Sequence, residues 1–291
     1  MFLVLNLLHC PKIINWTSSS LFLLALDLFL SIPKRSISSL QFIGNIIGLS
    51  CPDGHSFPGS YYSICIPAIS SYEWHPFSNT SACGISFLVS SNGLPSSWTT
   101  SLLCLAQRIQ STPVLFRGPF YSPSVGAINK SHSILVALGI GATPMISIIR
   151  SYIAFAKATT WDKTLSSPFQ DIKRLDFFWV LNSPEQITWL TETIDEVMLE
   201  SSRNLQLCSV LHFHFTLTSL TSLPSDYITQ LACTALTQNT PSAHGVSCEV
   251  FIGRTNWYSA LTHIVTQSPT PANIDLVSLL FANQYPSRAP P

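Results

Sequence analysis

Hydrophobic residues along the chain change their spacing near residue 118. From Leu40 to about Arg117 they come in short or alternating runs, separated by clusters of turn residues. Such runs predict short strands at residues 43–49, 60–66 and 85–89, with an Asn-Gly hairpin signal at residues 91–93. Several short strands at this spacing are typical of a small antiparallel barrel or sandwich.

Beyond residue 119 the pattern predicts alternating strands and helices. Strand patterns at residues 134–138, 177–181 and 211–217 are followed by helical patterns at residues 144–158, 184–201 and, more weakly, 227–236. Pro184 suits the first turn of its helix. This alternation predicts βαβ units and a parallel sheet. The expected fold is an antiparallel β-barrel domain, residues 37–125, followed by a parallel-sheet α/β domain, residues 126–291.

The first 36 residues are expected to be a separate, membrane-proximal segment. They hold two apolar blocks, residues 1–8 and 21–32, and neither reaches the roughly 20 apolar residues that a membrane span needs. The second block also contains Asp27, which a lipid-facing helix disfavours. We expect an interfacial helix with Lys34 and Arg35 on the cytosolic side. A buried core helix is the alternative.

Composition narrows the classes of function. Hydrophobic residues make up 46% of the chain and charged residues only 10%, against roughly 25% charged in an ordinary soluble domain. The chain is therefore expected to contact a membrane surface or to bury a large interface. With zero net charge and no basic run, nucleic-acid binding is not expected. The 8 cysteines include no C-x-x-C pair, which favours reduced thiols over a zinc site.

The sequence from residue 134 to residue 144 predicts a phosphate site. Gly139 and Gly141 lack a Cβ, so the backbone there can turn sharply and approach a ligand. Thr143 can cap the following helix, and Pro144 fits its first position. A helix start then favours an anion such as phosphate. Pro144 stands where the G-x-G-x-x-G fingerprint has its last glycine, and a tight turn without a ligand is the alternative.

A second candidate site lies in the β region, at residues 74–78. Pro76 restricts the backbone on both sides, which fixes the directions of Phe77 and of the Ser78 hydroxyl. An aromatic ring beside a directed hydroxyl suits a flat heteroaromatic ligand. An ordinary barrel corner with a packed phenylalanine is the alternative.

Six motifs occur in an order that resembles the C-terminal dehydrogenase region of NADPH oxidases, of the respiratory-burst type, and of ferric reductases. They are Pro58-Gly59-Ser60-Tyr61, Glu73-Trp74-His75-Pro76-Phe77-Ser78, Gly118-Pro119-Phe120, Leu138-Gly139-Ile140-Gly141-Ala142-Thr143-Pro144, Phe177-Phe178-Trp179-Val180 and Gly253-Arg254-Thr255-Asn256-Trp257. The resemblance extends from about residue 9 to residue 264. It implies a ferredoxin-reductase-like pair of domains that binds FAD and NADPH.

The resemblance also assigns site residues. His75, Pro76, Phe77 and Ser78 line the FAD isoalloxazine, Trp98 and Thr99 lie near the FAD phosphates, and Gly139, Gly141, Thr143 and Pro144 hold the NADPH pyrophosphate. Arg254 meets the ribose-phosphate of the adenosine end, because a guanidinium forks onto phosphate oxygens.

The implied chemistry needs no catalytic acid–base pair, because hydride passes between the two cofactors and the protein orients them. Electrons then leave through a haem-bearing membrane domain or partner, to give superoxide or a reduced metal. The module is expected to be membrane-associated and to face the cytosol. His212 and His214 alternate along one strand, but no third ligand accompanies them, so no metal site is expected.

Departures from the family pattern support a second hypothesis. Tyr121, Cys83 and Thr255 replace residues that are usual in its motifs, and the Cys-Gly-Pro motif of the last strand is missing. The alternative is therefore a non-catalytic truncated remnant, or a regulatory nucleotide-binding module of the same fold. A third hypothesis is a small membrane-associated interaction protein whose motif matches are coincidental.

Overall fold

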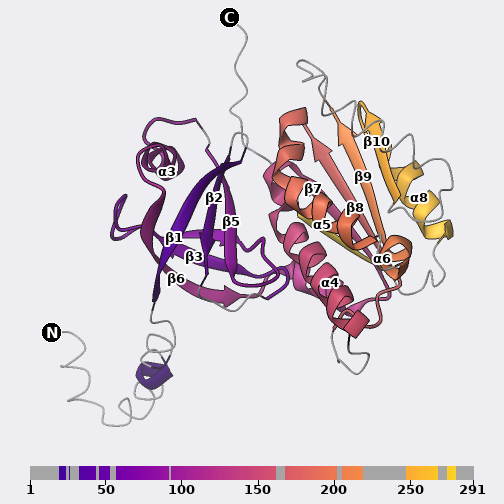
Figure 1. Ribbon diagram of the computed structural model, residues 1–291, viewed down its shortest axis with the longest axis horizontal. Coiled ribbons are helices and arrows are strands. Elements are labelled where there is room, and N and C mark those ends of the chain that lie inside the picture. The colour runs from indigo at the N-terminus through magenta and orange to yellow at the C-terminus, as the bar shows by residue number, and fades with distance from the viewer. Residues whose placement is uncertain are drawn as a thin grey trace, which may run out of the picture.

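Two sheets lie side by side in the computed structural model, which describes residues 20–23, 26, 33–43, 46–52, 57–91, 93–161, 168–201, 205–218, 247–267 and 274–279 (Figure 1). The first has six antiparallel strands in the order β4-β3-β6-β1-β2-β5. The second has five strands, all parallel, in the order β10-β9-β8-β7-β11. The predicted fold class, an antiparallel barrel followed by a parallel α/β domain, is confirmed.

The antiparallel sheet curls toward a barrel because its two end strands are neighbours in the sequence. Its elements are β1 (Lys34–Ile43), β2 (Ile46–Cys51), β3 (Tyr61–Cys65), β4 (His75–Ser78), β5 (Ile85–Ser90), α3 (Trp98–Ala106) and β6 (Ser111–Phe120). Between β4 and β5, the Thr80 amide donates to the Ser86 carbonyl at 2.8 Å, and the Ser86 amide donates to Asn79 Oδ1 at 2.9 Å. Asn79 is fully buried in this connection, so its side chain holds the start of β5 inside the barrel.

Three details of the barrel differ from the sequence-based expectation. Ile43 ends β1 and pairs with Ile46, the first residue of β2, so the run at residues 43–49 belongs to two strands. Lys34 and Arg35 are the first two residues of β1 and so belong to the barrel. The Asn-Gly signal does not join a hairpin, because β5 pairs with β2 and the chain continues into α3. Residues 20–23 and 26 are helical as expected, and most of the remaining N-terminal segment lies outside the described residues.

The parallel domain places helices on both faces of its sheet. After η1 (Pro123–Asn129) its elements are β7 (His132–Leu138), η2 (Gly139–Ala142), α4 (Thr143–Trp161), β8 (Arg174–Leu181), η3 (Pro184–Leu190), α5 (Thr191–Ser201), α6 (Leu205–Val210), β9 (Leu211–Leu217), β10 (Ser247–Ile252), α8 (Trp257–Gln267) and β11 (Ile274–Leu279). Helices α4, α5 and α6 cover one face and α8 covers the other (Figure 1). Strands buried on both faces are continuously apolar, as the sequence of β7 is.

The strands predicted at residues 134–138, 177–181 and 211–217 are confirmed, and so is the helix at residues 144–158. The helix predicted at residues 184–201 begins as the 3-10 helix η3 and continues as α5. The weak helix predicted at residues 227–236 lies outside the described residues.

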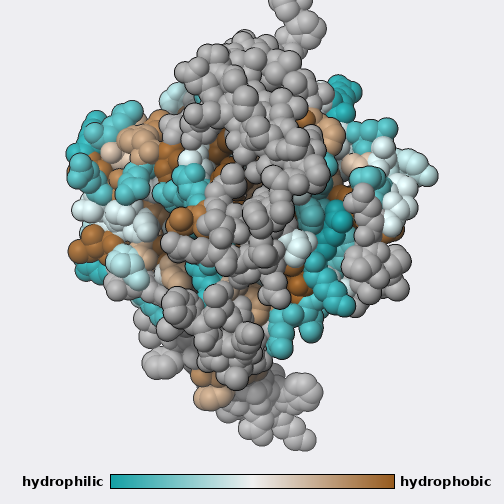
Figure 2. All heavy atoms as spheres, turned by 45° about the vertical axis from the view of Figure 1, so that its right-hand side comes forward, coloured by the Kyte–Doolittle hydropathy of each residue, from teal (hydrophilic) through white to brown (hydrophobic). Residues whose placement is uncertain are grey.

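Within the described chain, one helix is long and apolar enough to cross a membrane by length and composition. It spans Gly139–Ala158, and 67% of it is buried inside the fold. Its apolar residues pack on β7 and β8, so its composition reflects the core of the parallel domain. On the face in Figure 2, hydrophobic and hydrophilic residues of the described chain are mixed.

Phe177 tests the packing of the parallel domain. Its side chain is 1% exposed, and its ring lies 6.2 Å from that of Trp179 and 6.1 Å from that of Phe213. Removing the ring leaves a cavity, so Phe177→Ala should lower the free energy of unfolding by about 3–5 kcal/mol in urea denaturation. Val265→Ala, on the exposed side of α8, is the control and should change it by less than about 0.5 kcal/mol. Equal losses for the two variants would contradict this packing.

Candidate functional site

The glycine turn at the end of β7 is open to a ligand. Gly139 has φ +51°, a left-handed conformation that glycine adopts without strain, and its carbonyl accepts a hydrogen bond from Trp179 Nε1 at 2.9 Å. A Cβ placed on Gly139 would meet only the Gln186 amide nitrogen, at 3.8 Å. The space beside this backbone is therefore not filled by the described side chains.

Thr143 does not cap the helix, so that prediction is wrong. The 3-10 helix η2 begins at Gly139, and Thr143 already has helical angles, φ −54° and ψ −48°. Its hydroxyl donates to the Ile140 carbonyl at 3.1 Å, inside the turn. Helical backbone begins at the left-handed Gly139, four residues earlier than expected. Pro144 is therefore not the first residue of a helix either, because α4 begins at Thr143. Because each N–H of a 3-10 helix bonds to the carbonyl three residues before it, the amides that η2 leaves without a partner inside the helix are those of Gly139 and Ile140.

The position of this turn in the sheet favours a ligand. The chain leaves β7 through α4, on one face of the sheet, and reaches β11, on the other side of β7, after α8, which lies on the opposite face. In open parallel sheets, ligands bind outside the carboxyl ends of the strands at such a reversal of strand order. Gly139 and Gly141 stand at that place, where a helix start favours an anion.

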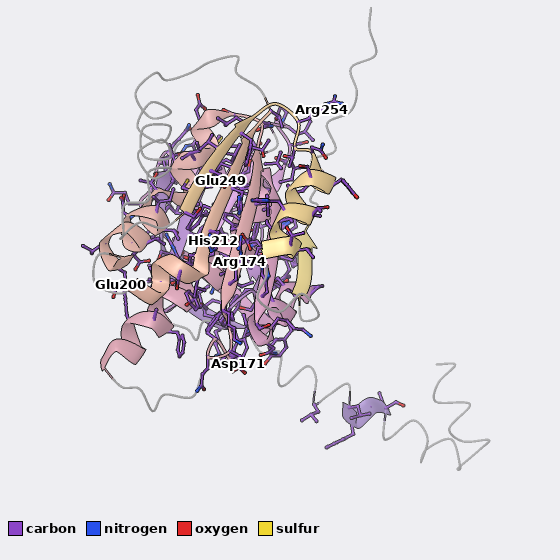
Figure 3. All side chains as sticks on the ribbon, turned by 90° about the vertical axis from the view of Figure 1, so that its right-hand side faces the viewer. Asp171, Arg174, Glu200, His212, Glu249 and Arg254 are labelled. Atoms are coloured by element: carbon purple, nitrogen blue, oxygen red, sulfur yellow. The ribbon has the colours of Figure 1, made fainter. Side chains whose placement is uncertain are left out.

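Arg254 stands at the same edge of the sheet, three strands away. It follows β10 and Gly253, whose φ is +106°, and its side chain is exposed. Three strand spacings of about 4.8 Å put the end of β10 roughly 14 Å from the end of β7. Arg254 lines a cleft of about 520 Å³ between α8 and the sheet, together with Phe178, His214, Glu249, Phe251 and His263. Figure 3 shows Arg254 at the end of β10, with Glu249 farther down the same strand.

A buried ionic network crosses four strands below this cleft. Asp176 accepts hydrogen bonds from His132 Nε2 at 2.7 Å, from His214 Nε2 at 3.0 Å and from Arg174, whose Nε and Nη2 lie at 2.8 and 3.1 Å. The other ring nitrogen of His214 lies 2.9 Å from Glu249 Oε2. The ring of His214 also stacks on Phe178, with the centroids 4.3 Å apart. The network thus joins β7, β8, β9 and β10.

This network shifts the pKa values of Asp176, His214 and Glu249. Burial would raise the pKa of Asp176, but hydrogen bonds from His132, His214 and Arg174 hold it far below its usual range. Burial would lower the pKa of His214, but the hydrogen bonds to Asp176 and Glu249 outweigh it and raise the pKa. The hydrogen bond from His214 lowers the pKa of Glu249. Burial lowers the pKa of His212, the next inward-facing histidine.

The four residues predicted to line an isoalloxazine do not share a face. They are consecutive in β4, so their side chains alternate between its two sides. His75 and Phe77 both pack on Trp98, with ring centroids 4.5 and 5.8 Å away. Pro76 and Ser78 lie on the other side, where Ser78 is opposite Tyr61, whose ring lies 5.3 Å from that of Phe120.

Trp98 and Thr99 begin helix α3. Ser97 caps this helix by accepting the Thr100 amide, and its first turn, residues 98–101, carries no acidic residue. Trp98 is 6% exposed, yet its Nε1 finds no hydrogen-bond partner among the described residues. An orphaned donor at a helix start without acidic residues fits an anionic or oxygen-rich ligand.

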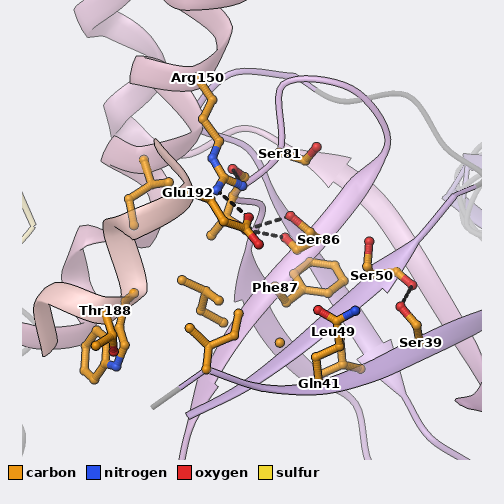
Figure 4. Close-up of a pocket in the computed structure, with 16 residues that line it drawn as sticks. Ser39, Gln41, Leu49, Ser50, Ser81, Ser86, Phe87, Arg150, Thr188 and Glu192 are labelled. Atoms are coloured by element: carbon orange, nitrogen blue, oxygen red, sulfur yellow. Dashed lines mark hydrogen bonds and ion pairs between the residues drawn. The ribbon is translucent and has the colours of Figure 1, made fainter. Parts of the chain in front are cut away.

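A second cleft, of about 240 Å³, lies between the two domains and was not predicted from the sequence (Figure 4). Ser39, Ser50 and Ser86 line it from the barrel, and Arg150 and Glu192 line it from α4 and α5. Arg150 crosses between the domains: its Nη1 donates to the Thr80 carbonyl at 3.4 Å, and its Nη2 lies 3.0 Å from Glu192.

Neither of the two clefts contains residues 75–78 or the glycine turn. Among the described residues, no group of three or more His, Cys, Asp or Glu side chains could hold a metal ion. The network around Asp176 was missed because its members lie on four strands far apart in the sequence. Only the pair His212 and His214 gave a signal for it.

Residues 131–277, just over half of the chain's 291 residues, match the family model of the ferric reductase NAD-binding domain. The chain belongs to this family. The resemblance to NADPH oxidases and ferric reductases, carried by the six motifs, is therefore confirmed.

Members of the respiratory burst oxidase family are similar to the chain over longer stretches. Respiratory burst oxidase homolog protein D of Solanum tuberosum is 32% identical over 54% of the chain and 21% of its own length. Protein B of Arabidopsis thaliana is 27% identical over 76% of the chain and 30% of its own length. Human NADPH oxidase 3 is 27% identical over 73% of the chain and 37% of its own length. The chain spans between about a fifth and two fifths of these relatives.

The His214 network predicts how stability depends on pH. Because its pKa is raised in the folded state, the contribution of protonated His214 is complete below its ordinary pKa of 6.5 and is lost as the pH rises through the higher folded-state pKa. Thermal unfolding from pH 5 to pH 9 should therefore show the wild type losing stability toward high pH relative to His214→Gln. A constant difference between the two proteins across this range would contradict the ion pairs.

Proposed function

We propose that the chain is the FAD- and NADPH-binding module of an NADPH oxidase or ferric reductase. The observation that carries the proposal is the glycine turn: a left-handed Gly139 with open space beside it, at the carboxyl edge of the parallel sheet where the strand order reverses. This is the place where a nucleotide pyrophosphate fits best in such a sheet.

The parallel domain offers groups for both ends of NADPH. The amides of Gly139 and Ile140 at the start of η2 and the absence of a Cβ at Gly139 and Gly141 suit the pyrophosphate. The exposed Arg254, about 14 Å along the same edge, suits a ribose phosphate. These two anchors would hold the nucleotide across the ends of β7, β8, β9 and β10. Thr143 and Pro144 would act by fixing the backbone of the turn.

The barrel offers groups that fit FAD. Ser78 and Pro76 face outward beside the Tyr61–Phe120 pair, which provides a flat aromatic surface next to a hydroxyl. His75 and Phe77 pack on Trp98 and would hold β4 against α3. The orphaned Trp98 Nε1, with Thr99 at the start of α3, suits the FAD phosphates.

Bound NADPH would supply a hydride and bound FAD would accept it, so the residues of this chain would act by binding and orienting the two cofactors. The chain would orient the two cofactors by holding its two domains in a fixed relative position. Its Gly59 amide donates to Ser147 Oγ at 3.3 Å, so the barrel turn before β3 is tied to α4, one helical turn beyond the glycine turn. Electrons would pass on to a haem-bearing domain or partner at a membrane, with oxygen or a metal ion as the final acceptor.

Dye reduction by the purified chain tests the proposed activity. Loaded with FAD, the protein should be yellow and should oxidise NADPH with an artificial electron acceptor. Nucleotide binding without turnover would favour the non-catalytic module instead. A colourless protein that takes up no FAD would contradict the flavin half of the proposal.

Gly139→Ala tests the nucleotide half. A Cβ there is strained at positive φ and projects into the open space, so the KM for NADPH should rise at least roughly tenfold, equivalent to about 1.4 kcal/mol. Gly93→Ala is the matched control, since Gly93 also has positive φ, +72°, and nothing lies within 4 Å of its added Cβ. Both variants should lose similar stability, but only the first should lose affinity. Equal KM values would remove Gly139 from the site.

A further inference from the structure

The cleft beside α8 contains two groups with opposite preferences for a ribose. Arg254 carries a guanidinium, which favours a ribose 2′-phosphate. Glu249 carries a carboxylate, whose negative charge repels a phosphate in the same cleft. The charge that Glu249 presents to the cleft therefore bears on which nucleotide the cleft accepts.

His214 lies next to Glu249 and can balance its negative charge. Its Nδ1 lies 2.9 Å from Glu249 Oε2, and its Nε2 lies 3.0 Å from Asp176 Oδ1. Ionised carboxylates only accept hydrogen bonds, so both ring nitrogens must carry a proton to satisfy both partners. His214 is then an imidazolium, only 7% exposed, and it neutralises Glu249 from below the cleft.

The surrounding groups do not take over this role. Arg174 on β8 and His132 on β7 are hydrogen-bonded to Asp176, and burial lowers the pKa of His212 on β9. His263 on α8 lines the same cleft and acts on Glu249 only through space. Glu249 on β10 therefore depends on His214 for its hydrogen-bonded positive partner among the described residues.

Loss of the His214 proton affects Glu249 more than Asp176. The neutral ring keeps one N–H, which Asp176 can retain because it is fully buried and an unpaired carboxylate there would cost most. Glu249 is 42% exposed and can be solvated instead. A neutral His214 thus leaves an uncompensated negative charge at the cleft, on the strand that leads to Arg254.

We propose that the His214–Glu249 pair makes the preference of the Arg254 cleft for a 2′-phosphorylated nucleotide depend on pH. This rests on the proposed function, in which the cleft takes the adenosine end of the nucleotide. The protonated pair is neutral and admits NADPH. The deprotonated pair carries the charge of Glu249, which disfavours the 2′-phosphate and leaves a ribose with a free hydroxyl, as in NADH, unaffected.

Binding of two probes tests this. Calorimetry with adenosine 2′,5′-bisphosphate and with AMP, from pH 6 to pH 9, gives the ratio of their affinities. In the wild type, this ratio should fall by roughly threefold as the pH rises, the size expected for one partly screened charge about a Debye length away. In Glu249→Gln, which keeps a hydrogen-bond acceptor for His214 without the charge, the ratio should not fall.

Two background effects are separated by the controls. The 2′-phosphate ionises a second time near pH 6, and His263 is another histidine in the cleft, but Glu249→Gln retains both groups and His263→Gln removes the second. An affinity ratio with the same pH profile in Glu249→Gln as in the wild type would overturn the role of the pair alone. If neither probe binds at any pH, the proposed nucleotide site itself fails, and the role of the pair with it.

Discussion

The hydrogen bond from Trp179 to the Gly139 carbonyl ties the open turn to the core of the parallel domain. Trp179 is fully buried in β8, and its Nε1 lies 2.9 Å from the Gly139 carbonyl oxygen. The backbone of the turn is therefore held against a buried strand. Helix α4 starts from this turn, and Ser147 and Arg150, three residues apart on one side of α4, contact the barrel at Gly59 and Thr80. The placement of both domains around the candidate site therefore depends on where this turn is held.

The chain has few charged residues, and several of them are gathered in the buried network around Asp176. Only 10% of the residues are charged, yet Asp176 is fully buried with two histidines and an arginine around it. Burying a carboxylate is costly unless several donors satisfy it, and here donors from three strands do so. The same arrangement places a protonated His214 under the exposed Glu249. His214 thus pairs with Asp176 inside the sheet and also balances the charge of Glu249 in the cleft that Arg254 lines.

The sequence predicted elements well where hydrophobic periodicity alone decides them. The apolar runs within β7 and β8, the strand β9 and the turn at Gly139 were predicted because buried parallel strands and glycine turns have local signatures. The boundary between β1 and β2 was missed, since apolar residues continue on both sides of the reversal at Ile43 and Ile46. The Thr143 cap was wrong because the helix starts earlier, in a 3-10 turn that composition does not mark. The faces of β4, the crossing by Arg150 and the network around Asp176 depend on tertiary contacts, and no local pattern encodes these.

The central claim is that the glycine turn at the end of β7 holds the pyrophosphate of a nicotinamide nucleotide. Hydrogen–deuterium exchange of the purified chain, with and without NADP⁺, tests it most directly. The account predicts slower exchange of the amides at residues 139–142 and near Arg254 when the nucleotide is bound, with the amides of α3 unchanged. Protection confined to the cleft between Arg150 and the barrel, with unchanged exchange at residues 139–142, would contradict it.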